Sequence, residues 1–135
     1  MKKTQRKQNT IRVISVPVGR QAYAKEIDRG LKALQNEVGG LIQVLYPFED
    51  EIALICNDEG KLMGLPLNRA LKVDGLSGTQ IYDIISGDFL IAFAPSDSEN
   101  FESMPDDLLR KYLAIFKYPE RFLIKNQTIY IYPER

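Results

Sequence analysis

The apolar residues of this chain fall into short runs, each about as long as a β-strand and bounded by turn-forming residues. Four of these runs are rich in β-branched, aliphatic and aromatic side chains, which favour strands. They are Thr10–Val18, Leu41–Phe48, Ile52–Cys56 and Phe89–Ala94. Even the longer run Phe89–Pro95 is far shorter than the ~20 apolar residues that a membrane-spanning helix needs. The pattern therefore predicts a sheet-rich fold with no membrane span.

The segments between these runs carry weaker signals. Asn57–Gly60 has the composition of a hairpin turn, with Gly60 free to take a left-handed conformation. Five residues cannot distinguish a strand from a short helix at Ile81–Ile85, so both stay open. The other expected elements are, in chain order, a return strand over residues 61–65, a single helical turn over 66–71, a loop over 73–80, and a terminal hairpin of Arg121–Lys125 and Thr128–Tyr132.

Two segments have the apolar spacing of an amphipathic helix. The first, residues 22–38, ends at Gly39-Gly40, a typical helix stop. The second, residues 105–117, has Ser103 as its expected N-cap and two acidic residues in its first turn, where they suit the helix dipole. The apolar positions of the first helix are Tyr23, Ile27, Leu31, Leu34 and Val38.

The order of these elements predicts an α+β fold. Because most of the strands follow one another through short links, the main sheet should be largely antiparallel, with both amphipathic helices on the same side of it. The length of 135 residues predicts one domain. Residues 1–9 are expected to form a basic disordered arm, residues 10–118 the single α+β domain, and residues 119–135 a β-hairpin extension packed on that domain.

The absence of His and the presence of only one Cys exclude several classes of enzyme. The chain has no His and one Cys, so it cannot build a Ser-His-Asp or Cys-His site, a Cys/His zinc site or an internal disulfide. We interpret the lone thiol, Cys56, as a small buried hydrophobe. No glycine-rich phosphate loop is present. Catalysis would have to rest on carboxylates or Tyr, so we expect a protein without enzymatic activity or cofactor.

The net charge of zero conceals opposed blocks. Residues 1–12 hold five basic residues and no acid, residues 13–72 hold seven basic and eight acidic residues, residues 73–109 hold eight acids and no base, and residues 110–135 hold six basic and two acidic residues. The acidic block is either a solvated loop followed by an acidic helix start, or a face that docks on a basic protein surface. The residues of that possible face are Asp97, Glu99, Glu102, Asp106 and Asp107.

Several polar residues stand inside apolar segments. A polar group that is buried without a partner costs roughly 1–3 kcal/mol, so these side chains must find partners. One interpretation is structural: the two asparagines cap turns and Arg69 forms an ion pair with Asp83. The other is a pocket for a nucleotide-like anion, held by Arg69 and oriented by amides. The residues concerned are Asn57, Asn68, Arg69, Tyr82 and Asp83.

Other charged clusters give weaker hypotheses. A third hypothesis is a DNA-associated regulator that contacts phosphates through the basic arm and through Lys117, Arg121 and Lys125. Short Lys-rich ends, however, are usually solubilising tails. The carboxylates of residues 49–51 and 58–59 match no calcium-loop spacing, so no metal site is expected. No apolar run of signal-peptide length follows the basic start, so we expect the protein to lie in the cytoplasm.

Four motifs resemble a small family of domains of unknown function from low-GC Gram-positive bacteria, their phages and their conjugative elements. They are VGG at 38–40, YPFEDEIALICNDEGK at 46–61, GLPLNRAL at 64–71 and IYDIISG at 81–87. The resemblance covers residues 11–118 and supplies no catalytic residue. It implies an accessory protein of a mobile element that acts by binding a host or element protein.

Overall fold

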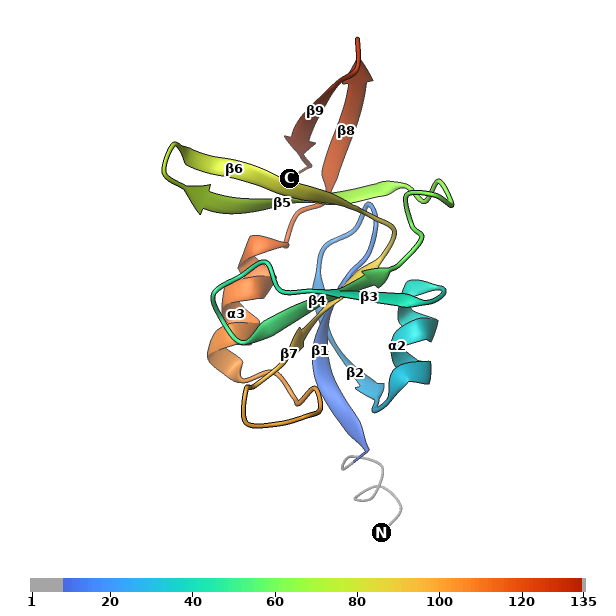
Figure 1. Ribbon diagram of the computed structural model, residues 1–135, viewed down its shortest axis with the longest axis vertical. Coiled ribbons are helices and arrows are strands. Elements are labelled where there is room, and N and C mark those ends of the chain that lie inside the picture. The colour runs from blue at the N-terminus through green and yellow to red at the C-terminus, as the bar shows by residue number, and fades with distance from the viewer. Residues whose placement is uncertain (1–8, 135) are drawn as a thin grey trace.

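The computed structural model describes residues 9–134, which form an α+β fold with antiparallel strand pairing (Figure 1). The expected basic arm, residues 1–9, lies outside the described residues except for Asn9. The five-stranded main sheet has the order β2-β1-β7-β4-β3, and β5-β6 and β8-β9 are separate two-stranded sheets. The elements are β1 Thr10–Val16, β2 Tyr23–Asp28, α2 Leu31–Val38, β3 Ile42–Leu45, β4 Ile52–Asn57, β5 Leu67–Gly75, β6 Gly78–Ser86, β7 Phe89–Phe93, α3 Asp106–Ile115, β8 Glu120–Lys125 and β9 Thr128–Pro133.

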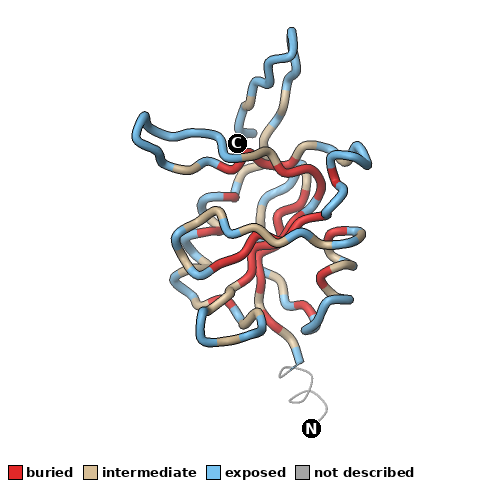
Figure 2. The backbone as a smooth tube through the Cα atoms, in the orientation of Figure 1, coloured by how far each residue is buried: buried red, intermediate tan, exposed pale blue. Residues whose placement is uncertain are grey.

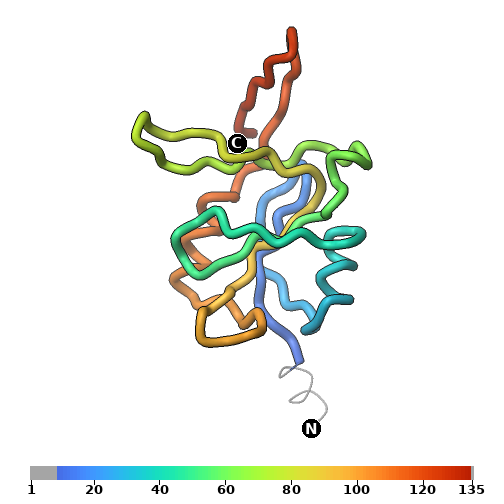
Figure 3. The backbone as a smooth tube through the Cα atoms, viewed as in Figure 1, coloured from blue at the N-terminus to red at the C-terminus, as the bar shows by residue number. Residues whose placement is uncertain are grey.

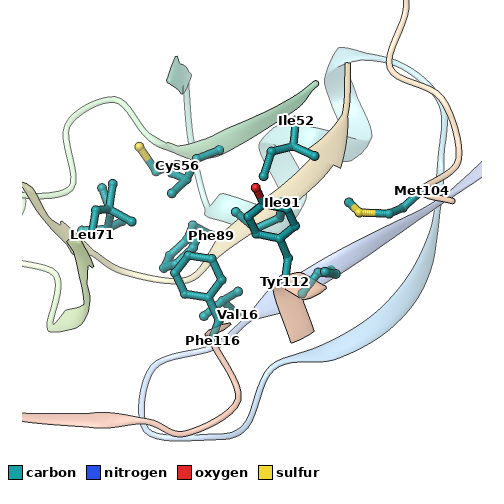
Figure 4. Close-up of a cluster of buried hydrophobic side chains, with 12 residues drawn as sticks. Val16, Ile52, Cys56, Leu71, Phe89, Ile91, Met104, Tyr112 and Phe116 are labelled. Atoms are coloured by element: carbon teal, nitrogen blue, oxygen red, sulfur yellow. The ribbon is translucent and has the colours of Figure 1, made fainter. Parts of the chain in front are cut away.

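The central strands β1, β7 and β4 are buried on both faces (Figure 2). Alternate residues of these strands contribute to two separate apolar clusters, as expected for the pleat of a strand. The first cluster is covered by Tyr112, which lies in α3, and by Phe116, which directly follows α3. Figure 4 shows both side chains beside Phe89. Leu34 and Val38 of α2 cover the second.

The two helices therefore lie on opposite faces of the sheet, and the prediction that they share one side is wrong. All six residues of Ile52–Asn57 are buried, as are all but one of Phe89–Phe93. Strands that are apolar on both faces need cover on both faces. The uninterrupted apolar runs in the sequence indicate that both faces of the sheet are covered. They do not indicate which helix covers which face.

The helix predicted over residues 22–38 is wrong in its first half, because Tyr23–Asp28 is the edge strand β2. A spacing of four residues places Tyr23 and Ile27 on one face of a helix, but also on one face of a strand, so the spacing could not separate the two. Pairing with β1 decides in favour of the strand, and Gly30, at φ 108°, separates it from α2. The predicted second helix, residues 105–117, is confirmed as α3.

The segment from residue 61 to residue 86 also differs from expectation. Residues 61–65 form turns instead of a return strand, residues 66–71 are extended instead of helical, and the predicted loop over 73–80 is the closed end of the β5-β6 hairpin. Gly75 and Gly78 pair across that end, so the two glycines shorten the connection to a tight turn instead of lengthening it. The open question at Ile81–Ile85 is resolved as strand β6.

At the C-terminus the predicted hairpin is confirmed as β8-β9, with Asn126 and Gln127 both at positive φ, as a two-residue turn of this kind requires. The expected N-cap is wrong: Pro105 holds that position, and the Ser103 Oγ instead accepts a hydrogen bond from the Arg12 N–H at 3.0 Å. No helix among residues 9–134 is long and apolar enough to cross a membrane.

Gly87 joins β6 to β7 in a conformation that excludes other residues. Its φ is 83°, and a Cβ atom placed on it would lie 2.8 Å from Leu65 Cδ1. We expect Gly87→Ala to lower the free energy of unfolding by about 1–3 kcal/mol, measured by urea unfolding. Gly19→Ala is the matched control, because Gly19 has φ 73° but open space around it. Equal losses in the two variants would contradict a contribution from the Leu65 contact.

Candidate functional site

The five residues of the hypothesised anion pocket do not come together in the structure. Asn68 and Arg69 are buried together at the start of β5, while Asn57 ends β4 and Asp83 lies on β6. Tyr82 is exposed on the β5-β6 hairpin, with 55% of its surface accessible. The sequence grouped these residues by their apolar surroundings, and that criterion selects buried polar side chains wherever they occur.

Arg69 is 2% exposed, and its guanidinium contacts backbone carbonyls from distant parts of the chain. Its Nη2 donates to the Arg20 carbonyl at 2.7 Å and to the Phe116 carbonyl, at the end of α3, at 3.0 Å. Its Nη1 donates to Asn68 Oδ1 at 2.7 Å. Burial lowers the pKa of Arg69, and the nearby Glu120 carboxylate raises it.

Asn68 completes this buried network. Its Nδ2 donates to the carbonyls of Val16, at 2.7 Å, and Gly87, at 2.9 Å. Next to it, the Ala70 N–H donates to Glu120 Oε1 at 2.7 Å and so ties the start of β8 to β5. We call Asn68, Arg69 and Glu120 the polar hub. Apart from Arg69 Nε, which is buried without a hydrogen-bond partner among the described residues, the donors of the hub bind the protein's own groups, so an anion could reach the guanidinium only by entering this buried network.

The predicted ion pair between Arg69 and Asp83 is wrong. Across the hairpin Arg69 lies opposite Ile85, whereas Asp83 lies opposite Leu71. Asp83 Oδ1 instead pairs with Lys61 Nζ at 2.6 Å, at the surface. The sequence showed that both residues are present, but the strand register places Arg69 inside the fold and Asp83 at its surface.

Asn57 has the structural role that the sequence suggested. Its Nδ2 donates to the Val38 carbonyl at the end of α2, at 3.1 Å, and its Oδ1 accepts from the Glu59 N–H at 2.8 Å. It lines a small cavity of about 260 Å³ together with Cys56 and Asp83. Burial raises the pKa of the Cys56 thiol to about 11, so this cysteine is a poor nucleophile at neutral pH.

The acidic block does not form one face. Asp74 and Asp83 lie on the β5-β6 hairpin, whereas residues 94–105 lie at the opposite end of the molecule (Figure 3). Glu102 pairs with Arg29 at 3.0 Å, and Asp106 pairs with Arg12 at 2.7 Å. Of the five carboxylates proposed for the face, the exposed ones without an ion-pair partner among the described residues are Asp97, Glu99 and Asp107.

A cleft between α2 and residues 94–101 is a feature that the sequence did not reveal. Its volume is about 660 Å³, and its floor is apolar because it lies over the second apolar cluster. Two large apolar side chains at the cleft are well exposed: Leu31 at 57% and Tyr46 at 65%. We call it the α2 cleft; its floor residues are Ile11, Leu34, Ile42 and Phe101.

The wall of the α2 cleft is held by hydrogen bonds. Arg29 Nη1 donates to the Phe101 carbonyl at 3.2 Å, and Ser98 Oγ donates to Glu102 Oε2 at 2.9 Å. The Asn100 N–H donates to Ser98 Oγ at 3.1 Å. The hydrogen bond from Ser98 and the pairing with Arg29 lower the pKa of Glu102. These hydrogen bonds hold the loop of residues 98–102 in place.

The rim of the α2 cleft carries unpaired negative charge. Asp28 and Glu99 line it, both are exposed, and neither has an ion pair within residues 9–134. Arg29, the basic residue of the lining, is paired with Glu102. The one sequence signal here was Glu99 in the acidic block, since the other lining residues come from four separate segments.

In the described part of the chain, no three His, Cys, Asp or Glu side chains are grouped so as to hold a metal ion. The acidic residues 49–51 have other contacts: Asp50 Oδ2 accepts hydrogen bonds from Lys111 Nζ at 2.6 Å and from the Tyr112 hydroxyl at 2.7 Å. Asp50 thus fixes the loop before β4 to α3.

Comparison with protein families gives one match. The model of DUF3846, a domain of unknown function, matches residues 11–117 and ends before β8. No curated protein and no solved structure matches the chain.

The polar hub generates a prediction about stability. Arg69→Met leaves the Arg20 and Phe116 carbonyls without their donor, so we expect the free energy of unfolding to fall by about 2–4 kcal/mol in urea titrations. Arg69→Lys keeps the charge but not the planar fork, and should give a smaller loss. Arg121→Met, at an exposed arginine paired with Glu134, is the control and should change stability by less than about 0.5 kcal/mol. A stable Arg69→Met variant would contradict the role of the hub.

The cleft wall generates a prediction about pH. Because the pKa of Glu102 in the folded state is below its ordinary value of 4.5, its contribution to stability is present at neutral pH and is lost as pH falls through the folded pKa. We expect Glu102→Gln to be less stable than the wild type at neutral pH, and this deficit to shrink in acid. Urea unfolding of both proteins across the acidic range tests it, and a deficit independent of pH would refute it.

Proposed function

Because the chain belongs to the DUF3846 family, whose description assigns no activity, we propose a function from its own surface: it is a non-enzymatic accessory protein of a phage or other mobile element, and it acts in the cytoplasm by binding a host or element protein. The partner contributes an apolar and basic segment, which lies in the α2 cleft. The observation that carries this proposal is the apolar floor of the cleft beneath unpaired carboxylates.

The floor supplies the attraction. A volume of about 660 Å³ is within the range of roughly 300–1,000 Å³ typical of ligand sites, and it accommodates a few side chains of a peptide. Leu31 and Tyr46 offer exposed apolar surface at the cleft, and tyrosine is enriched where proteins bind one another. Covering these side chains removes apolar area from water, which favours association.

The rim supplies the selectivity. Asp28 and Glu99 attract basic groups and repel acidic ones, and Asp97, which follows the lining residue Pro95, adds to the same field. A lysine or arginine beside an apolar residue in the partner matches both parts of the cleft. A nucleic acid backbone does not, because its phosphates would face carboxylates.

Two further observations support a binding role. The chain lacks the residue types of common nucleophilic and zinc-dependent sites, and its one thiol is buried. The motif resemblance implies a mobile-element setting, in which small accessory proteins act by binding. The anion pocket receives no comparable support, since the polar hub uses Asn68 and Arg69 internally.

The proposal predicts that the full chain binds a synthetic peptide of alternating lysine and leucine residues, measured by calorimetry, and does not bind the same peptide with glutamate in place of lysine. Removing both rim charges in Asp28→Asn/Glu99→Gln should weaken binding about tenfold, which is ~1.4 kcal/mol. Tyr46→Ala should weaken it through lost apolar contact.

Asp107→Asn is the matched control, because Asp107 is exposed, unpaired within the described residues and not part of the cleft lining. It should bind like the wild type. Amide chemical-shift changes caused by the peptide should cluster on α2 and residues 94–101. Equal binding by all variants, or shifts confined to another surface, would reject the cleft as the site.

A further inference from the structure

The outer edge of β9 is an open strand edge. The hairpin β8-β9 is a sheet of its own, and no other strand in residues 9–134 pairs with it. It projects from one end of the molecule, with most of its residues exposed, while α2 lies toward the other end (Figures 1 and 2). Edges of this kind offer unpaired backbone groups to another chain.

The register shows which backbone groups face outward. The Glu134 N–H donates to the Pro119 carbonyl at 2.7 Å, so residue 134 directs its backbone toward β8. In an antiparallel pair the direction alternates along the strand, and Tyr132, Tyr130 and Thr128 therefore also face β8. Ile129 and Ile131 direct their N–H and C=O groups to the open edge.

Most of β9 lacks the usual protection of an edge. Residues 128–132 are Thr-Ile-Tyr-Ile-Tyr, with no charge and no proline, and four of the five are isoleucine or tyrosine. The last residue of the strand, Pro133, is a proline, so the unprotected stretch ends at Tyr132. Protected edges carry charged residues, often lysine, or proline. The neighbouring strand β8 does so, with Arg121 and Lys125. The asymmetry directs any pairing to β9.

Both faces of the hairpin also leave apolar side chains in solvent. Leu123 and Tyr130, which lie opposite each other, are 51% and 44% exposed on one face. Ile124 and Ile129, also opposite each other, are 65% and 41% exposed on the other. A two-stranded hairpin is at best marginally stable alone, and further strands stabilise it.

We infer that a second copy of this chain supplies the missing strand, through antiparallel pairing of β9 with β9 about a two-fold axis at Tyr130. In this register Ile129 of each copy lies opposite Ile131 of the other, so their outward N–H and C=O groups form four hydrogen bonds without involving Pro133. Tyr130 of one copy lies opposite Tyr130 of the other, and Thr128 of each copy lies opposite Tyr132 of the other. No charged residues between 128 and 132 come together, and the interface is self-complementary, as a two-fold dimer requires.

The size of the contact sets the expected affinity. An aromatic side chain buries roughly 150–250 Å². Half-exposed Tyr130 and Tyr132, with Ile129 and Leu123, thus supply on the order of 400 Å² per copy, about half of a standard interface. An interface smaller than the standard size belongs to the weak, transient class, so the dimer should be reversible, and it forms a continuous four-stranded sheet, β8-β9-β9-β8.

Sedimentation equilibrium of the full chain over a range of concentrations tests the inference. The wild type should shift from monomer to dimer as concentration rises. Tyr130→Lys and Tyr130→Glu each place like charges opposite one another at the axis, and each should weaken the dimer at least tenfold. An equimolar mixture of the two variants places lysine opposite glutamate and should restore dimer formation. If Tyr130 only stabilised the fold of each copy, mixing the variants would not restore the dimer.

Tyr82→Lys is the control, because Tyr82 is similarly exposed on the other hairpin and should leave the dimer unchanged. Circular dichroism and urea unfolding of each variant confirm that the fold is kept. A wild type that stays monomeric at every concentration, variants that dimerise like the wild type, or a mixture that stays monomeric would each overturn the inference. None of these outcomes depends on peptide binding in the α2 cleft.

Discussion

The guanidinium of Arg69 contacts the loop between β1 and β2 through the Arg20 carbonyl and the end of α3 through the Phe116 carbonyl. Through Asn68 it is linked to β1 and to the turn before β7, and beside it Glu120 binds the backbone of β5. A planar group with five donors can join such distant segments, whereas an apolar side chain could not satisfy their carbonyls. The main sheet, α3, β5-β6 and β8 are positioned relative to one another by this hub.

A sheet with two apolar faces explains where the α2 cleft lies. Covering both faces requires α2 on one side of the sheet and α3 on the other. Because α2 has only eight residues, it leaves part of the sheet face beneath it uncovered. Residues 94–101 form the opposite wall, which the Arg29 to Glu102 pair holds in place. The exposed surface of Leu31 and Tyr46 follows from the shortness of the helix, so the candidate binding site is a consequence of how the sheet is covered.

Local signals predicted some elements well and failed at others for identifiable reasons. The hairpin around Asn126-Gln127 and the helix starting at Asp106 were predicted because their turn and helix signals are local. The strand Tyr23–Asp28 was missed because a spacing of four residues fits both strand and helix, and only pairing with β1 distinguishes them. Asn57 was interpreted correctly as a cap, whereas Arg69 was assigned the wrong partner because pairing across a hairpin depends on register.

The sequence by itself determined the α+β class, the absence of histidine chemistry, the opposed charge blocks and the lack of charge in residues 128–132, because these depend only on residue type and short-range order. The tertiary structure decided which charges remain unpaired within residues 9–134, since Glu102 and Asp106 meet arginines from distant segments while Asp28 and Glu99 have no ion pair in that part of the chain. It also decided that the buried arginine donates hydrogen bonds to backbone carbonyls of distant segments. Charge neutralisation and burial are set by distances between residues far apart in the chain, and those distances exist only once the chain has folded.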